Sequence, residues 1–260
     1  MIKFTAFFLL VCACGHVSAQ SPANHVSQPI EWTSFNLYVA FSKRIALVND
    51  GNFRFVQNFQ SQQHQLRSGL EIVISKKLSV VPIGYSYIWN YRYGEQPAKY
   101  VNNEFRFWQQ IQYKHKIGRV AIGHRLRIEE RNIEKHDDPN KDGKIVNEGY
   151  TNEQFRLRYR LNSILPLTAV EGATKYYFLN VWDEVHYSHD YAGCHNIQYT
   201  NTPSQNRFFA GIGYQFSKSC SVQSGFLYQW LKKDDGVRSE NNLGVLLQFN
   251  YGLALFKAAK

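Results

Sequence analysis

The stretch that decides the fold is FRLRYRL at residues 155–161, where arginines alternate with Phe155, Leu157, Tyr159 and Leu161. A period of two places the arginines on one face of a β-strand and the apolar side chains on the other. An arginine that faces lipid at the middle of a bilayer costs about 2–4 kcal/mol. If this strand crosses a membrane, its arginines must therefore point away from the lipid.

The alternation recurs along most of the chain. A soluble β-sandwich also alternates, but these segments are long, at or above the roughly 9–11 residues that a tilted strand needs to cross a bilayer. Trp or Tyr stands near several segment ends, as in the interfacial girdles of membrane barrels. The sequence therefore predicts an all-β transmembrane barrel. Its eleven segments are 32–41, 45–59, 65–74, 81–90, 104–113, 120–131, 155–161, 177–187, 205–216, 222–230 and 243–251.

The connections between the segments alternate in length. Transmembrane barrels have short periplasmic turns and long external loops. If the chain ends in the periplasm, the first and last segments both run inward. Bacterial single-chain barrels have an even number of strands, so we expect an antiparallel up-and-down barrel of twelve strands, the first of them within 21–29. The short connections are 42–43, 75–77, 117–118 and 217–219; the long ones are 92–100, 134–149, 163–175, 189–203 and 232–240, of which 163–175 does not suit the scheme.

The N-terminus has the features of a secretory signal peptide. Lys3 precedes an apolar stretch, and a small-x-small sequence ends at Ala19. Cys12 and Cys14 form part of a lipoprotein-type signal, which is the alternative. We expect a cleaved signal peptide at 1–19, a single barrel domain at 20–260, and a location in the bacterial outer membrane.

The chain is basic, with 30 Lys and Arg against 20 Asp and Glu. In an intracellular protein this balance would suggest nucleic acid binding. Export argues against a nucleic acid partner. The expected partners are outer-membrane lipid and lipopolysaccharide, the barrel-assembly machinery during biogenesis, and small solutes.

Charged residues at period two inside the segments form the candidate site, and the cost of arginine in lipid predicts that they line the lumen. Arginine pairs bidentately with carboxylates and tolerates partial burial. Two interpretations stay open: a structural network that fills the lumen, and a lining that attracts anionic solutes, as positive rings do in anion pores. The predicted lumen-lining residues are Glu104, Arg106, Arg125, Arg127, Glu129, Arg131, Arg156, Arg158, Arg160, Glu184 and Arg207.

We predict no catalytic residue, no metal site and no cofactor. A hydrolase needs a nucleophile, a base and an orienting group within hydrogen-bond reach, and the chain has no nucleophile elbow. We interpret His124 as a tolerated interfacial histidine on the outer face. Glu184 and His186 are interpreted as hydrogen-bonded wall, and the His and Cys residues of 189–195 as a minor candidate for a soft metal.

Six short runs of sequence within the predicted strands, taken together, resemble a family of small exported proteins known as domain of unknown function 2490. The resemblance extends over 32–251 and implies an outer-membrane β-barrel of a Gram-negative bacterium, without a known substrate or catalytic residues. The runs that carry it are 103–110, 123–131, 155–161, 180–184, 205–207 and 211–214.

The sequence therefore favours an outer-membrane barrel that serves as a narrow or plugged pore for small, anionic solutes, or as a structural envelope protein. One alternative is an enzyme of the outer membrane that acts on lipid. Another is a surface binding or adhesion module that works through the polar connections 134–149 and 189–203, which are long enough to carry function.

Overall fold

The computed structural model describes residues 25–95, 97, 101–136, 147–168, 173–190, 203–233 and 237–256. The signal peptide expected at 1–19 lies outside these residues. All regular structure in the described part is β, and it contains no helix long and apolar enough to cross a membrane. The strands are β1 (His25–Val26), β2 (Pro29–Ala40), β3 (Ile45–Val56), β4 (Gln60–Val73), β5 (Leu78–Asn90), β6 (Asn102–Ile117), β7 (Val120–His136), β8 (Asn147–Pro166), β9 (Tyr176–Asp190), β10 (Gln205–Ser217), β11 (Cys220–Lys232) and β12 (Ser239–Ala254).

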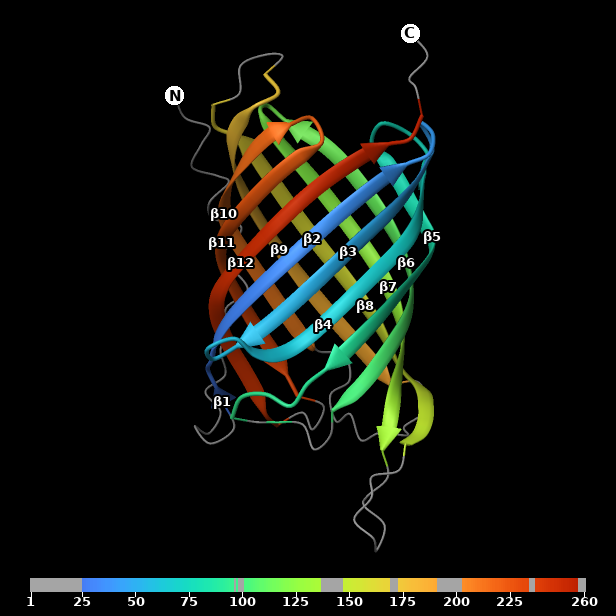
Figure 1. Cartoon of the computed structure of the whole chain (residues 1–260), viewed down its shortest axis with the longest axis vertical. Coiled ribbons are helices and arrows are strands. Elements are labelled where there is room, and N and C mark those ends of the chain that lie inside the picture. Colours follow the sequence, from blue (N-terminus) through green and yellow to red (C-terminus); the bar gives the residue numbers. More distant parts are fainter. Residues whose placement is uncertain are drawn as a thin grey trace, which may run out of the picture.

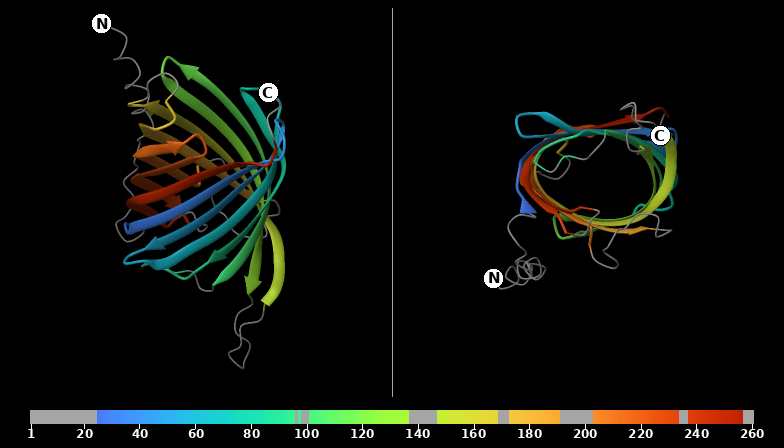
Figure 2. Two further views of the ribbon diagram at one scale, coloured as in Figure 1. Left: turned by 45° about the horizontal axis from the view of Figure 1, so that its top comes forward. Right: turned by 90° about the horizontal axis from the view of Figure 1, so that it is seen from below.

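The strands form a closed, tilted barrel (Figures 1 and 2). From β2 to β12 each strand pairs with the next in antiparallel fashion. The barrel closes by a parallel pairing of β12 with β2, which runs from Leu243 opposite Pro29 to Ala254 opposite Ala40. The arrows of β2 and β12 accordingly point to the same end of the barrel in Figure 1.

This closure corrects the prediction of a fully antiparallel barrel of twelve strands. Within 21–29 only His25–Val26 is a strand among the described residues, and it pairs in parallel with Ser239 and Glu240 of β12. β2 uses the same edge of β12 further along, from Leu243 onward. Because β1 continues the line of β2, it occupies no position of its own, and the wall in the described part of the chain has eleven strands.

Two further segments differ from their predictions. The strand expected at 155–161 is much longer, because β8 runs from Asn147 to Pro166 and takes up parts of the connections expected at 134–149 and 163–175. Residues 45–59 were expected to form one strand, but β3 ends at Val56, and Gln57, Asn58 and Phe59 all have positive φ angles, of 43°, 64° and 64°. This tight turn makes the β3–β4 connection short, although it lies at the same end as the long connections. The turns β2–β3, β4–β5, β6–β7 and β10–β11 lie at the opposite end, which we call the short-turn end.

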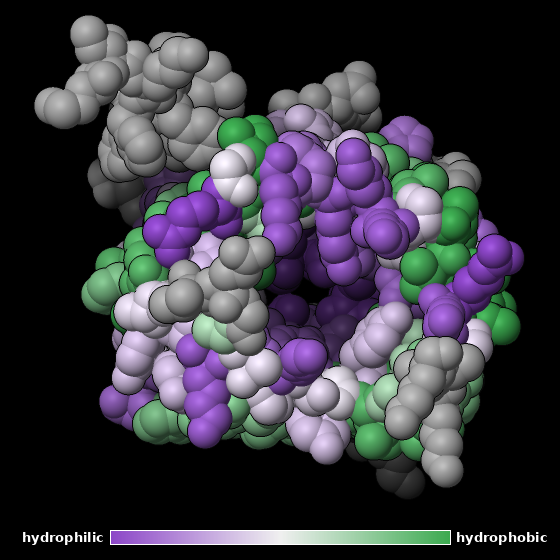
Figure 3. Space-filling model, turned by 90° about the horizontal axis from the view of Figure 1, so that it is seen from above, coloured by the Kyte–Doolittle hydropathy of each residue, from purple (hydrophilic) through white to green (hydrophobic). Residues whose placement is uncertain are grey.

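The two faces of the wall differ as the alternation predicts. Apolar side chains on the outer face are exposed; Phe226 is 71% and Leu243 59% accessible. Seen from the short-turn end, polar side chains surround a central hollow (Figure 3). The inner face also carries an apolar cluster that includes Trp32, Trp182 and Phe209, in which the last two rings stack at 5.5 Å.

The largest inner side chain on β6, Trp108, depends on glycines in the neighbouring strands. A Cβ atom added at Gly84 would lie 2.1 Å from its indole ring, and one added at Gly69 would lie 2.5 Å from it. Both distances are far below van der Waals contact, so only glycine at these positions lets the ring lie flat against the wall. Trp108 is consequently 3% exposed.

Candidate functional site: a charged layer inside the barrel

Cross-strand register brings the interior charges together. Glu129 of β7 stands opposite Arg156 of β8. Glu184 of β9 stands between Arg160 of β8 and Arg207 of β10. The period-two pattern of each strand therefore becomes a set of rows that run around the wall, with each carboxylate next to arginines. We call this set the charged layer: Asp50, Arg67, Glu104, Arg106, Arg125, Arg127, Glu129, Arg131, Arg156, Arg158, Arg160, Glu184, His186 and Arg207.

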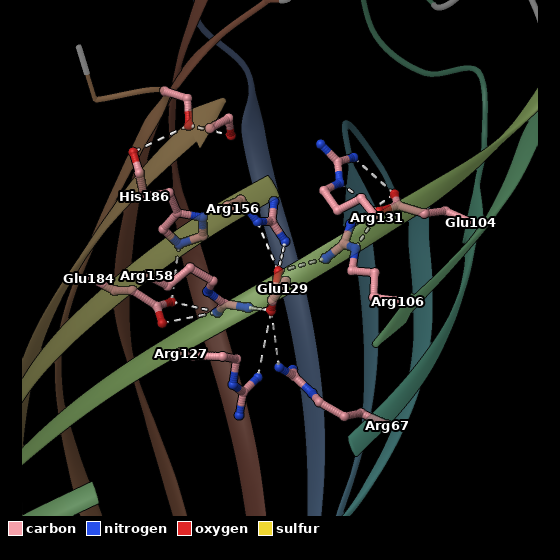
Figure 4. Close-up of polar contacts among 12 residues, drawn as sticks. Arg67, Glu104, Arg106, Arg127, Glu129, Arg131, Arg156, Arg158, Glu184 and His186 are labelled. Carbon is pink, nitrogen blue, oxygen red and sulfur yellow. Dashed lines mark hydrogen bonds and ion pairs between the residues drawn. The ribbon is translucent and has the colours of Figure 1, made fainter. Parts of the chain in front are cut away.

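Glu129 is at the centre of the layer (Figure 4). Its Oε2 accepts a hydrogen bond from Nε of Arg156 at 2.9 Å, and its Oε1 accepts one from Nη1 of Arg158 at 2.5 Å. Arg106 approaches Oε2 at 3.5 Å. Two more guanidinium groups complete the shell, those of Arg127 at 3.9 Å and Arg67 at 4.0 Å from Oε1.

Glu184 is the second centre. Nη2 of Arg158 donates to both of its oxygens, at 2.9 and 3.0 Å, so Arg158 joins the two carboxylates. Arg160 donates to Oε2 at 3.3 Å, and Arg125 donates to Oε1 at 2.5 Å. His186 Nε2 lies 3.3 Å from Oε2.

Glu104 and Asp50 extend the layer. Glu104 accepts a forked pair of hydrogen bonds from Nε and Nη2 of Arg131, at 2.6 and 2.9 Å, and also pairs with Arg106. Asp50 pairs with Arg67 at 2.9 Å. Bidentate arginine–carboxylate pairs fix geometry as well as charge, so these contacts hold neighbouring strands in register.

Tryptophan rings cover several of the guanidinium groups. The Cζ atom of Arg127 lies 4.3 Å from the ring centre of Trp108, and that of Arg160 lies 4.1 Å from the ring of Trp182. Trp32 receives Arg54 at 4.4 Å. Cation–π contacts of desolvated arginines contribute about 2 kcal/mol or more each. Arg127 and Arg160 also lie within 4 Å of Glu129 and Glu184, so the rings add to the stabilisation that these carboxylates give the two arginines.

The side chains at the centre of the charged layer are almost completely buried. A water-filled channel leaves the side chains along it exposed, but Glu104 and Glu184 are 0% accessible, Glu129 is 1%, and Arg127 and Arg158 are 4%. The structure places all eleven predicted residues on the inner face. Arg125, Arg131 and Arg160 lie at the margins of the layer, with side chains that are 17–25% accessible.

The sequence analysis missed part of the layer. Asp50 belongs to β3, whose irregular pattern hid its inner face, and Arg54 of the same strand, which lies outside the layer over Trp32, was missed for the same reason. Arg67 stands at period two with Gln65 and Glu71, and that signal was available in the sequence. Nothing in the pattern indicated which tryptophans would cover the arginines.

A cavity of about 880 Å³ lies beyond the charged layer at the short-turn end. It opens at the hollow seen in Figure 3. Its inner boundary includes Arg125 and Arg160, and Trp182 lies beside them. The cavity therefore lies between the charged layer and the short-turn end.

His124, one of the histidine candidates, contacts two neighbouring side chains. No group of three or more His, Cys, Asp or Glu residues in the described part of the chain could hold a metal ion. His124 Nδ1 lies 2.8 Å from the Tyr159 hydroxyl, and its ring stacks on that of His115 at 5.2 Å. Cys194 and His195 lie outside the described residues.

Comparison with known proteins leaves the activity open. No curated protein matches the chain. A family model described as protein of unknown function (DUF2490) matches residues 31–240, which include most of the wall and the whole charged layer. The chain therefore belongs to this family, DUF2490.

Proposed function

We propose that this protein is an outer-membrane β-barrel whose lumen is closed by the charged layer, so that it acts as a plugged barrel of the envelope and not as an open pore. The observation that carries the proposal is the burial of Glu104, Glu129 and Glu184, which are at most 1% accessible at the centre of a closed wall.

Two features support the membrane location. The outer face exposes large apolar side chains on many strands, among them Phe35, Ile83, Phe226 and Leu243. A water-soluble barrel would expose a continuous apolar surface of the kind that drives association. The arginines within the strands, which belong to β3, β4, β6, β7, β8 and β10, point to the inner face, where they avoid the cost of contact with lipid.

The charge balance of the layer supports anion selectivity in any form of the barrel whose lumen the charged layer no longer blocks. The arginines of the layer outnumber its carboxylates, Asp50, Glu104, Glu129 and Glu184. Positive rings of this kind select anions in pores. The interpretation of these arginines as a lining that attracts anionic solutes therefore applies to an open form of the barrel, and the structural-network interpretation applies to the closed form.

The test is the conductance of the refolded mature protein in a planar bilayer. We expect a silent membrane for the wild type and anion-selective openings for Trp108→Ala, which removes a ring that helps to fill the lumen. Trp230→Ala is the matched control, because Trp230 lies on the outer face of β11. Steady openings of the wild type would contradict the plug, and a gel shift on heating verifies that each variant is folded.

A further inference from the structure

The cavity at the short-turn end has an unusual distribution of charge. One side of its lining carries Lys76, Lys77, Lys114 and Lys116, and the inner boundary adds Arg125 and Arg160. No Asp or Glu is among the described residues that line it. We call this cavity the basic vestibule.

The lysines of the vestibule are not neutralised by the rest of the barrel. Within the described ranges, no ion pair involves the side chains of Lys76, Lys77, Lys114 or Lys116. Lys114 and Lys116 stand two residues apart on β6, on the same inner face as Glu104 and Arg106. Four ammonium groups around one opening repel each other, and an anion among them relieves that repulsion.

The inner boundary carries donors and an acceptor that are left unused. Arg125 and Arg160 each pair with Glu184, but their Nε atoms are buried without a partner among the described residues. Asn180 donates from Nδ2 to Gln223 at 2.9 Å, while its Oδ1 is also buried and unpartnered in that part of the chain. Asn180 itself is 5% accessible. Buried polar atoms are normally hydrogen-bonded, so these three atoms point to a ligand or to bound water.

The side of the vestibule away from the lysines carries amides and aromatic rings. Amides of β8 to β12 can donate and accept hydrogen bonds, which suits a ligand with many hydroxyl groups. Tyr176, Phe178 and Trp182 supply flat apolar surface beside them. The amides are Asn162, Asn180, Gln215, Gln223, Gln248 and Asn250.

We infer that the basic vestibule binds a small, polyhydroxylated anion such as a sugar phosphate, taken from the aqueous side at the short-turn end. The cavity volume of about 880 Å³ lies in the range of roughly 300–1,000 Å³ that is usual for small-molecule sites. Most of the lining residues are inner-face positions, so the site is separated by the wall from lipid headgroups outside. The ligand is therefore a free solute.

The test is calorimetric titration of the refolded protein in uncharged detergent with glucose 6-phosphate, with glucose and inorganic phosphate as comparison probes. We expect the sugar phosphate to bind at least tenfold more tightly than either comparison probe. The double variant Lys114→Gln/Lys116→Gln should weaken its binding about tenfold or more. Lys218→Gln is the matched control, because Lys218 lies at the same end in the β10–β11 turn but does not line the cavity.

Three results of this titration would contradict the inference wholly or in part. Lack of binding by folded wild-type protein would overturn the inference. An equal loss of affinity in the Lys218→Gln variant would also overturn it, because the binding would then depend on the general positive charge of the surface. If inorganic phosphate bound as tightly as glucose 6-phosphate, the inference that the ligand is polyhydroxylated would be overturned. Because the titration needs neither a bilayer nor a conducting state, its result does not depend on whether the lumen is plugged.

Discussion

Arg158 of β8 donates a hydrogen bond from Nη1 to Oε1 of Glu129 on β7, at 2.5 Å, inside a closed barrel. Both side chains are almost completely buried, at 4% and 1% accessible. A buried pair of this kind contributes little compared with an apolar pair of equal size, but its disruption leaves a buried charge uncompensated. Its main effect here is on geometry, because the same arginine also holds Glu184.

The loss of the Glu129 charge should destabilise the barrel strongly. Glu129→Gln leaves Arg156 and Arg158 without their shared carboxylate, so we expect the free energy of unfolding in detergent to fall by about 3–5 kcal/mol. Glu130→Gln removes the same charge at an exposed position on the opposite face and should cost less than about 1 kcal/mol. Urea titration of both variants gives the comparison. Similar losses in the two would show that burial of the charge does not matter.

The parallel closure can be tested by a cross-link. Thr33 and Leu247 are register partners of the β2–β12 pair. In a background without native cysteines, Thr33→Cys/Leu247→Cys should form an intrachain disulfide on mild oxidation. Thr33→Cys/Leu243→Cys, which shifts one partner four residues along β12, should not. A twelfth strand inserted between β2 and β12 would prevent the first cross-link, and mass spectrometry of peptides distinguishes the results.

Membrane insertion predicts a cost for charge on the outer face. Phe226 stands at the middle of β11 and is 71% accessible. Phe226→Arg should lower the free energy of folding into phospholipid vesicles by about 2–4 kcal/mol. Phe226→Gln is the uncharged polar control and should cost less. If arginine were tolerated as well as glutamine in vesicles, this face would not meet the lipid core.

A cluster at the end of the barrel opposite the short turns makes stability depend on alkaline pH. Tyr93 and Lys233 lie beyond the ends of β5 and β11, and Glu240 is the second residue of β12. Lys233 pairs with the fully buried Glu240, and the Tyr93 hydroxyl lies 3.4 Å from the same carboxylate. Burial alone would lower the pKa of Lys233, but Tyr93 and Glu240 outweigh it and raise that pKa above its ordinary value of 10.5. Burial, aided by Glu240, also raises the pKa of Tyr93 above 10.0.

Deprotonation of Lys233 at alkaline pH removes this stabilisation. A raised lysine pKa means that the stabilisation is complete below about pH 10 and is lost as the pH rises through the raised value. Lys233→Met should therefore cost about 3 kcal/mol at pH 7, and its difference from the wild type should shrink as the pH rises above 10.5. Urea unfolding at several pH values measures this. A difference independent of pH would refute the role of the charge, and Lys218→Met, in an exposed turn, should show almost none.

The alternation of side chains was enough to predict much of the barrel. It located the eleven long strands to within a few residues at most ends, and it separated the arginine face from the apolar face of FRLRYRL. The parity of the connections also predicted that the first and last strands run in the same direction, as β2 and β12 do. The step from there to twelve strands was wrong, because it relied on the even number typical of antiparallel closure.

What the sequence determined by itself was therefore local: a period of two is a property of each strand, and the cost of arginine in lipid acts on each residue separately. Which carboxylate meets which guanidinium, how a parallel pair closes the wall, and whether the lumen is filled were decided only by the tertiary structure. These depend on the register between strands and on the diameter of the barrel. Asp50 and Trp108 contact Arg67 and Arg127 of the next strand through the register of their hairpins, whereas Arg207 of β10 meets Arg54 over the Trp32 ring because the wall closes between β12 and β2.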